Sequence, residues 1–546
     1  MFVLKINNQT REMTMKTRLM DLIEDPNKEY FVALVNHRLR ELTYEVSYDA
    51  TIEFLNSKNP DAVYVYESSL RFLVAWAFKN IYPDFKIKFN YSISRSIFCQ
   101  ILNLEHQYDM KNIVANVITE INRLIEADLP FIRKIVSNEE AVLFYKENGY
   151  DDKIDIIRYR PEKNVHLYTG GEYTNYMYGY MVPSTGYLKS FVLRAYHPGI
   201  LIQYPRAEAG GNIPRFEDAP IYGRTLKEAS RWADTTSAKT IADVNRQAKS
   251  KSVVEFVQMS EVRQSAMLSD LGNKIKADIE NIRLIAIAGP SSSGKTTFST
   301  RLKIELMTKG LKPVMISLDD YYLNREDILP DENGQVDLEN INTLDYALFN
   351  QNMLSLIQGD EVEIPHFDFT IGRRTHYKKM RIDESSPIII EGIHALNETL
   401  TSTIPKHQKF KIFISPQLQM NIDNHNPISI TDIRLLRRIV RDKKFRNSPA
   451  IQTISMWPSV RRGEFRWIYP HQENADYVFN SSLVYELCVM KKYAMPTLLE
   501  IDRNSEYFMT ANRLLKFLKY FVDIDEKLVP CNSLLREFIG DSCFNV

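Results

Sequence analysis

The stretch that decides the fold is Gly289-Pro290-Ser291-Ser292-Ser293-Gly294-Lys295-Thr296. It fits the pattern G-x-x-x-x-G-K-[ST], follows the apolar run 284–288 and opens a segment with helical periodicity. Glycines in such a loop let backbone N–H groups approach phosphates, and the helix that follows points its positive end at them. With 19 glycines in 546 residues, a chance match is on the order of one in two hundred. The stretch therefore predicts a site for ATP or GTP.

The residues of this loop are expected to divide the work of phosphoryl transfer. Lys295 would reach the β- and γ-phosphates, and the Thr296 hydroxyl would bind Mg²⁺. The residues expected to bind the nucleotide are Gly289, Ser291, Ser292, Ser293, Gly294, Lys295, Thr296 and Thr297.

Apolar strands and helical segments alternate on both sides of the loop. Continuous apolar runs such as 388–390 are typical of a parallel sheet that is covered on both faces. Strands are expected at 284–288, 313–317, 387–390, 410–415 and 477–480, with helices at 296–308, 343–358 and 430–441. The fold class that follows is an α/β domain, a parallel sheet with helices on both faces, preceded by two α+β domains.

Chain length and pattern changes suggest about three to five domains. The expected divisions are 1–60 and 61–219 as α+β domains, 220–281 as a helical connector, 282–505 as the phosphate-binding domain and 506–546 as a helical tail whose apolar spacing indicates packing. Lys plus Arg equals Asp plus Glu at 69 each, so net charge favours neither a nucleic-acid binder nor a membrane-surface protein. Four scattered cysteines, no signal-peptide pattern and no apolar stretch of about 20 residues predict a cytoplasmic protein without membrane contact.

Carboxylates follow two strands at the edge of the sheet where ligands bind. The segment Asp319-Asp320-Tyr321-Tyr322 comes after one strand, and Glu391-Gly392 comes after another. A carboxylate there can accept the proton of an acceptor hydroxyl, and a second can hold Mg²⁺. The alternatives are a helix N-cap aspartate and a solvated loop glutamate. An N-K-x-D motif, which a GTPase would carry, is absent from the sequence.

Arginines recur on one helical face farther along the chain. Arg434, Arg437, Arg438 and Arg441 stand at i, i+3, i+4 and i+7. Like charges repel unless an anion lies among them, which favours a lid over a triphosphate rather than a solvated helix. Residues 432–467 carry ten bases and three acids, plus seven, whereas 319–345 carry nine acids and one base, minus eight. The neutral total therefore conceals an acidic acceptor side and a basic lid.

Together these motifs resemble the uridine kinase and phosphoribulokinase branch of P-loop kinases, over about residues 284–500. The resemblance also rests on Pro365-His366-Phe367-Asp368-Phe369 with Arg374. It implies the α/β kinase fold, ATP and Mg²⁺ as cofactors, and phosphorylation of a nucleoside 5′-hydroxyl. The implied catalytic residues are Asp319 as general base, Lys295, Arg438 and Arg441. Thr296 and Glu391 are the implied Mg²⁺ ligands, and the implied acceptor contacts are Tyr322 and Phe367 beside the base, Glu339 or Asp337 on the ribose, and Arg374.

Two departures from the family pattern bear on which base the site would accept. Gly372 stands where uridine–cytidine kinases usually have a histidine, and Glu339-Asn340 stands where an aspartate and a proline are usual. Uridine or cytidine is the leading acceptor. The alternatives are a kinase for another small hydroxylated metabolite and an RNA-binding regulator that uses the P-loop domain as a nucleotide switch.

The N-terminal half resembles the amino-terminal portion of threonyl-tRNA synthetases. Residues 33–42 are similar to the β-grasp TGS domain, and residues 82–84 and 182–187 to the editing domain. The family's four metal-binding positions fall on Ser68, Phe72, Met177 and Met181. Because these side chains cannot bind a borderline metal or activate water, we expect the editing chemistry to be lost. The resemblance leaves RNA or tRNA as a candidate partner, and a homo-oligomer is compatible with the sequence.

Overall fold

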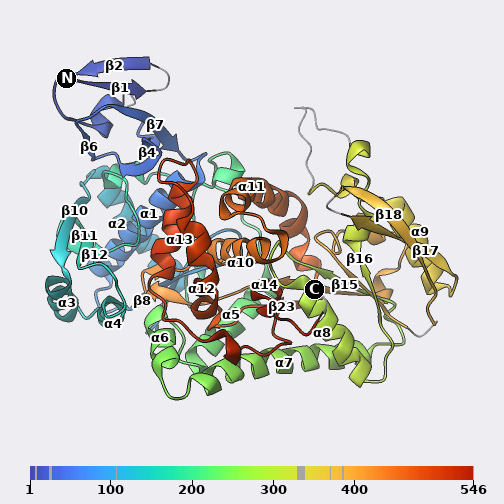
Figure 1. The fold of residues 1–546 in the computed structure, drawn as a ribbon. Helices are drawn as coiled ribbons and strands as arrows, with labels where there is room; N and C mark the ends of the chain where they lie inside the picture. Colours follow the sequence, from blue (N-terminus) through green and yellow to red (C-terminus); the bar gives the residue numbers. More distant parts are fainter. Residues whose placement is uncertain are drawn as a thin grey trace.

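A five-stranded parallel sheet organises the second half of the molecule (Figure 1). The computed structural model describes residues 1–546 apart from 7–8, 24–26, 106, 329–338, 369–370, 384–385 and 545–546. The strand order is β16 (Val314–Ser317), β19 (Ile388–Glu391), β15 (Leu284–Ala288), β20 (Lys409–Ser415) and β23 (Tyr477–Asn480). Each neighbouring pair runs parallel. This confirms the predicted α/β class.

Both faces of the sheet are covered because its strands are apolar on both sides. On one face, Ile285 and Ile287 pack against α8 (Lys295–Thr308) and α7 (Val253–Ala277). On the other, Leu284 and Ala286 pack against α9 (Tyr346–Ile357). The predicted connector thus supplies α7 as a covering helix, after α5 (Pro220–Thr235) and α6 (Ile241–Lys249).

The first residues of the chain form a small mixed sheet. Its order is β2 (Gln9–Met13), β1 (Phe2–Ile6), β7 (Ala50–Asn56), β4 (Tyr30–Val35) and β5 (Arg38–Glu41). Alternate residues such as Leu4 and Ile6 are buried, whereas Lys5 is exposed, so one face of β1 forms the core.

A second α+β unit follows, with two antiparallel sheets and two main helices. One sheet joins β10 (Ile132–Ser137), β11 (Asn164–Gly170) and β12 (Tyr173–Tyr176), and the other joins β13 (Val192–Tyr196), β14 (Gly199–Gln203), β9 (Ile97–Ile101) and β8 (Ile87–Tyr91). The helix α1 (Pro60–Ile81) is buried along most of its length, and α2 (Met110–Glu126) buries one stripe. Two short helices, α3 (Asn138–Glu147) and α4 (Asp151–Ile157), complete the unit.

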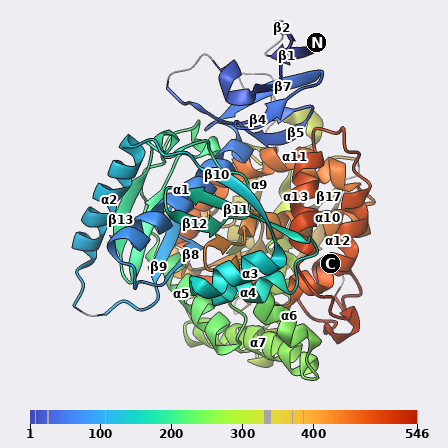
Figure 2. The same ribbon diagram turned by 90° about the vertical axis from the view of Figure 1, so that its left-hand side faces the viewer.

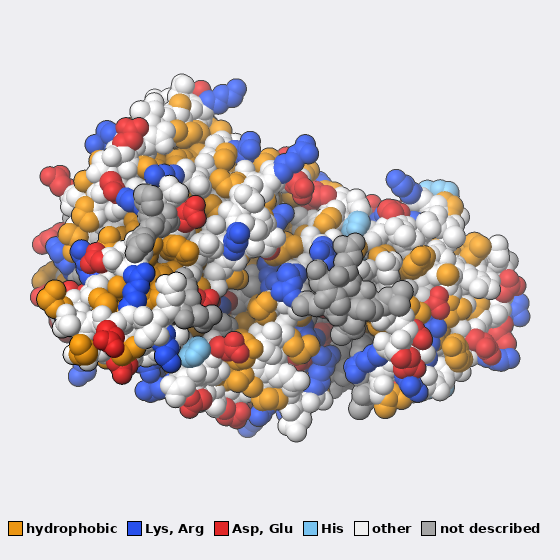
Figure 3. Space-filling view, turned by 90° about the horizontal axis from the view of Figure 1, so that it is seen from above, with side chains coloured by type: hydrophobic (Ala, Val, Ile, Leu, Met, Phe, Trp, Pro, Cys, Tyr) orange, Lys and Arg blue, Asp and Glu red, His pale blue; other side chains and the backbone are white. Residues whose placement is uncertain are grey.

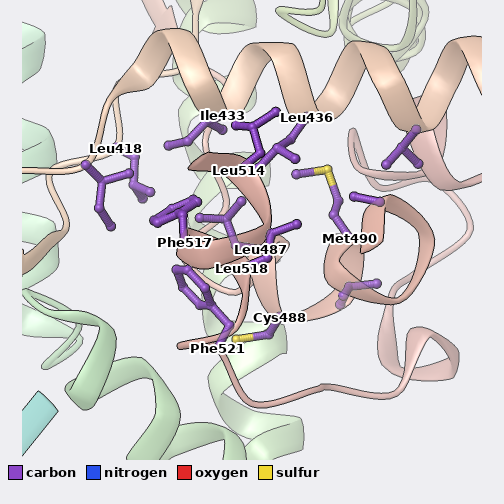
Figure 4. Packing of buried hydrophobic residues seen from close by; sticks show 14 of the residues in the cluster. Leu418, Ile433, Leu436, Leu487, Cys488, Met490, Leu514, Phe517, Leu518 and Phe521 are labelled. Atoms are coloured by element: carbon purple, nitrogen blue, oxygen red, sulfur yellow. The ribbon is translucent and has the colours of Figure 1, made fainter. Parts of the chain in front are cut away.

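The C-terminal helices share one core with the arginine helix. These elements are α10 (Ile430–Arg446), α11 (Ala450–Gly463), α12 (Glu486–Leu499), α13 (Phe508–Leu518) and α14 (Arg536–Ile539). Figure 4 shows Leu514, Phe517 and Leu518 of α13 facing Ile433 and Leu436 of α10. The C-terminal tail therefore packs against α10, the helix that carries the arginines of the expected lid. Among the described residues, no helix combines the length and apolar character needed to cross a membrane.

A hairpin from the sheet domain enters the second α+β unit. It comprises β21 (Asn421–Asp423) and β22 (Asn426–Pro427). Asp423 accepts a hydrogen bond from the buried Lys153 ammonium at 2.7 Å, and the Phe89 N–H donates to the Asn424 carbonyl at 2.8 Å. The His425 Nδ1 lies 2.6 Å from the Asn175 amide nitrogen. Arg160 of the same unit also donates to the Tyr520 hydroxyl at 3.0 Å, and Figures 1 and 2 show the unit beside the C-terminal helices.

We predict that His425 makes this interface sensitive to acid. Burial, and then the nearby Lys153 charge, lower the pKa of His425 to about 3 from its ordinary 6.5. The stabilising effect of its neutral form is complete above pH 6.5 and is lost as pH falls toward 3, by up to about 2 kcal/mol at pH 5. Calorimetric unfolding of wild type and His425→Asn at pH 7.5 and 5.0 checks this. The variant should lose less stability on acidification, and an equal loss in both proteins would contradict the assignment.

Candidate functional site

The phosphate loop lies at the carboxyl end of the central strand β15. A Cβ at Gly289 would lie 2.1 Å from the Ile414 carbonyl oxygen, so only glycine allows this approach to β20. Gly294 has φ +90° and turns the chain into α8. The loop therefore delivers the first-turn N–H groups of α8, which have no partner within the helix, to the edge of the sheet.

Several polar side chains of the loop and of the first turn of α8 are buried. The Lys295 ammonium folds back onto the Gly289 carbonyl at 3.0 Å. Among the described residues, the buried hydroxyls of Ser292, Ser293 and Thr297 have no hydrogen-bond partner in the protein. Buried polar groups normally have partners, so these hydroxyls indicate that a ligand with acceptor oxygens belongs here.

The arginine helix α10 contacts the loop directly. The Arg434 guanidinium donates to the Ser291 carbonyl at 3.0 Å, and Arg437 donates to the Ser292 carbonyl at 3.3 Å. Arg438 donates to the Ser291 hydroxyl at 3.0 Å. These bonds fix the position of α10 relative to the loop.

Carboxylates of the protein are the anions among these arginines. Arg434 and Arg437 are about 1% exposed and pair with the buried Glu464 and Glu486, respectively. Arg438 and Arg441 share Asp442 at 3.3 and 3.1 Å. The four arginines thus share three carboxylates, so the positive charge of this face is paired only in part within the protein. The lid role of Arg438 and Arg441 stays a prediction.

The predicted carboxylates meet beside the loop. Ser317↔Glu391 and Ile287↔Glu391 are register pairs, so the ends of β16, β19 and β15 are adjacent. The Ser317 hydroxyl donates to Glu391 at 3.4 Å and accepts from the Asp319 N–H at 3.3 Å. Asp319 thus lies in the turn Leu318–Tyr321. Both alternatives noted above, a capping role and a solvated loop position, fit less well, since Ser317 caps this turn and Glu391 is largely covered.

The ionisation of these groups is coupled. Burial raises the pKa of Asp319, an effect that the Lys295 charge opposes. Burial, and then the Asp319 carboxylate, raise the pKa of Glu391 to about 7. Burial lowers the pKa of Lys295, and Glu391 and Asp319 oppose that shift. Perturbed groups that influence one another in this way are typical of functional sites.

Two of the predicted acceptor residues, Tyr322 and Glu339, have a pKa raised by burial, and both lie near enough to Asp319 for its charge to raise the pKa further. The Tyr322 and Phe367 rings lie 5.7 Å apart between centroids, at 52°. Burial, and then the nearby Glu464, raise the pKa of Glu339 to about 7. Asp337 and Phe369 fall outside the described residues. The acceptor roles of Tyr322, Phe367 and Glu339 stay predictions.

Arg374 has a different environment from the one expected of a substrate contact. Its guanidinium donates to the carbonyls of Tyr322 and Tyr321 at 3.0 and 2.9 Å and to Asp345 at 3.1 Å. It is only 13% exposed in its side chain. These contacts connect β18 (Arg373–Met380) to the turn that carries Asp319, which is the arrangement of a positioning residue.

The structure gives Asp320, one of the carboxylates indicated by the sequence, two partners: it accepts from the Phe367 N–H at 3.3 Å and lies 3.0 Å from His366 Nδ1. It also adds residues that the sequence patterns did not single out. Glu464 and Glu486 are distant in sequence from the arginines they neutralise, so no local spacing indicates them. Glu537, near the end of the chain, accepts from the Thr297 N–H at 3.0 Å.

The donor set at the edge of the sheet suits Mg²⁺. The Thr296 hydroxyl and the Glu391 carboxylate are hard oxygen ligands, and Mg²⁺ commonly takes one or two carboxylates together with substrate phosphates. Within the described part of the chain, no group of three or more His, Cys, Asp or Glu side chains could hold a metal ion alone. The residues therefore fit an Mg²⁺ ion whose remaining ligands come from a phosphorylated molecule.

Comparison with known proteins identifies this domain. Residues 284–486 match the model of the Phosphoribulokinase / Uridine kinase family. They form a P-loop kinase domain of that family. A uridine kinase of Proteus mirabilis is 29% identical over 202 residues, which cover 36% of this chain and 85% of that enzyme. A solved D-glycerate 3-kinase from Cryptococcus neoformans aligns over 46% of this chain and 88% of its own, at 13% identity and a TM-score of 0.23.

The region before the kinase domain is similar to other proteins. A threonine–tRNA ligase of Syntrophomonas wolfei is 30% identical over 185 residues, 33% of this chain. The chain covers 29% of that ligase and less than a third of each of the first few ligases it matches. The resemblance of the N-terminal region to these ligases is thereby confirmed. Ser68, Phe72, Met177 and Met181 are all at most 2% exposed, in the core of the second α+β unit.

We predict that breaking the Arg434–Glu464 pair destabilises the kinase domain. In Glu464→Gln, the buried Arg434 and Arg461 would lose a charged partner, at a cost of about 3–5 kcal/mol. Urea denaturation measures the loss. Glu500→Gln is the matched control, because the Glu500–Lys443 pair is largely exposed and should change stability by less than about 1 kcal/mol. Equal effects of the two substitutions would contradict the structural role of the pair.

Proposed function

We propose that this protein is an ATP-dependent kinase that phosphorylates the 5′-hydroxyl of a nucleoside, with uridine or cytidine as the acceptor. The observation that carries the proposal is the meeting of Asp319, Glu391 and Lys295 beside a phosphate loop whose buried hydroxyls lack protein partners. The family match and the uridine kinase relative support the same class of reaction.

The residues present can each take a step of the transfer. Asp319 is a proton acceptor whose raised pKa suits it to take the acceptor's hydroxyl proton. The acceptor oxygen bonds to the γ-phosphorus of ATP while the bond from that phosphorus to the β,γ-bridging oxygen breaks, and ADP leaves. Lys295 and the first-turn N–H groups of α8 hold the triphosphate and stabilise charge that develops on the transferring group. Arg438 and Arg441 lie on the covering helix, where they can exclude water and add positive charge.

Mg²⁺ would be held by Thr296 and Glu391 together with the triphosphate, and it would neutralise phosphate charge when bound. A flat acceptor agrees with aromatic side chains at Tyr322 and Phe367, which argue for a nucleoside over a sugar phosphate.

We predict that Asp319→Asn lowers kcat by about 10²–10⁴-fold while the Kd for ATP changes less than about threefold, because the amide cannot accept the proton. The measurement is monophosphate formation from a panel of nucleosides with ATP and Mg²⁺, followed by chromatography. Asp360→Asn, at an exposed carboxylate after α9, is the matched control and should behave as wild type. Wild-type turnover by Asp319→Asn would remove Asp319 from its role.

The same panel separates the alternative functions. If the protein phosphorylates another hydroxylated metabolite but no nucleoside, the kinase proposal stands and the proposed acceptor changes. A second candidate, an RNA-linked regulator, is favoured by the similarity of the N-terminal region to threonine–tRNA ligases. RNA-stimulated ATP hydrolysis without any phosphorylated acceptor would support it and overturn the kinase proposal.

A further inference from the structure

The end of the chain contributes a carboxylate to the phosphate loop. Glu537 lies on α14 and is 8% exposed. Its Oε2 accepts a hydrogen bond from the Thr297 backbone N–H at 3.0 Å. Thr297 is the third residue of α8, so this N–H is one of the first-turn donors that have no partner within the helix. Glu537 lies outside the residues that match the family model, 284–486.

The segment that carries Glu537 is anchored on both sides. The Arg536 guanidinium donates to the carbonyls of Glu526 and Val529, each at 2.8 Å. The Arg437 guanidinium lies over the Phe538 ring, with its Cζ 5.0 Å from the ring centroid. Leu534 lies beside the loop, 3.7 Å from the position that a Cβ on Gly294 would take. Because the backbone of α14 is held in this way, the freedom left to Glu537 is rotation of its side chain.

Charge makes this contact compete with a phosphate. An anion at the first turn of a helix is stabilised by the free N–H groups and by the helix dipole, and Lys295 adds a full positive charge. Glu537 also raises the pKa of Glu391, after burial and Asp319, so three carboxylates surround one lysine. A polyphosphate that enters the loop would meet a carboxylate already bound to one of its donors. The buried Thr297 hydroxyl, which has no protein partner, points to a ligand at this same residue.

We propose that Glu537 is an internal anion that competes with the phosphates of the nucleotide for the N-terminus of α8 and thereby sets nucleotide affinity. The inference rests on the proposed function, since it requires that the loop binds a nucleotide. Binding requires the Glu537 side chain to leave the Thr297 N–H, while α14 stays in place. Loss of the negative charge at Glu537 should therefore raise the affinity for the nucleotide and lower the stability of the nucleotide-free protein.

The test uses the full chain and Mg·ATP as the probe, with binding measured by isothermal titration calorimetry. Glu537→Gln keeps the shape and removes the charge, and it should bind Mg·ATP about tenfold more tightly than wild type. The melting temperature of its nucleotide-free form should fall by about 2–4 °C. Glu537→Asp retains the charge but is one methylene shorter, so it should also bind more tightly. Asp541→Asn, at a 78% exposed carboxylate on the same segment, is the control and should match wild type in both measurements.

The outcomes distinguish the two proposals. Equal or weaker binding by Glu537→Gln and Glu537→Asp, with normal binding by wild type, would overturn the competition and leave the proposed kinase intact. Absence of Mg·ATP binding in wild type and in all variants would overturn the nucleotide site itself. Tighter Mg·ATP binding together with a lower melting temperature supports the competition. Substitution of a residue with only a structural role would reduce both the affinity for Mg·ATP and the melting temperature.

Discussion

The pairing of two buried arginines with two buried carboxylates is the constraint on which the kinase domain depends. Arg434 and Arg437 could not be buried on α10 as free charges, so Glu464 and Glu486 must approach from other elements. Once neutralised, the arginines donate to the Ser291 and Ser292 carbonyls. One set of ion pairs therefore fixes the helix, the loop and the segments after the helix in a single arrangement.

The same helix links the other parts of the molecule. Its apolar face joins the core formed by α12, α13 and α14 (Figure 4). The hydroxyl of Ser429, the N-cap of α10, lies 3.3 Å from the Tyr64 hydroxyl of α1. The hairpin that precedes α10 contacts the second α+β unit through Asp423 and Lys153. Basic side chains gather near the middle of one face of the molecule, between its two halves (Figure 3). The similarity to threonine–tRNA ligases thus lies in a region that is packed against the kinase domain.

Local sequence patterns were enough to predict the strands of the sheet and the position of the phosphate loop after strand β15. Strands β15, β23 and β4 begin and end where the apolar runs do, because a buried strand needs apolar residues on both faces. Helix ends were less predictable: α9 begins at Tyr346, three residues after the expected position 343, since Asp345 caps it. The arginine spacing correctly indicated one helix but not its partners, which are far away in the sequence.

By itself the sequence determined the phosphate loop, the parallel sheet and the carboxylates at its edge, because each depends on residues within one strand and the turn after it. Tertiary structure alone decided which carboxylates pair with the α10 arginines, that Arg374 holds the turn that carries Asp319, and that Glu537 reaches Thr297 across 240 residues. The physical reason is that burial of a charge requires a partner from wherever the fold can supply one, and no local pattern specifies that source.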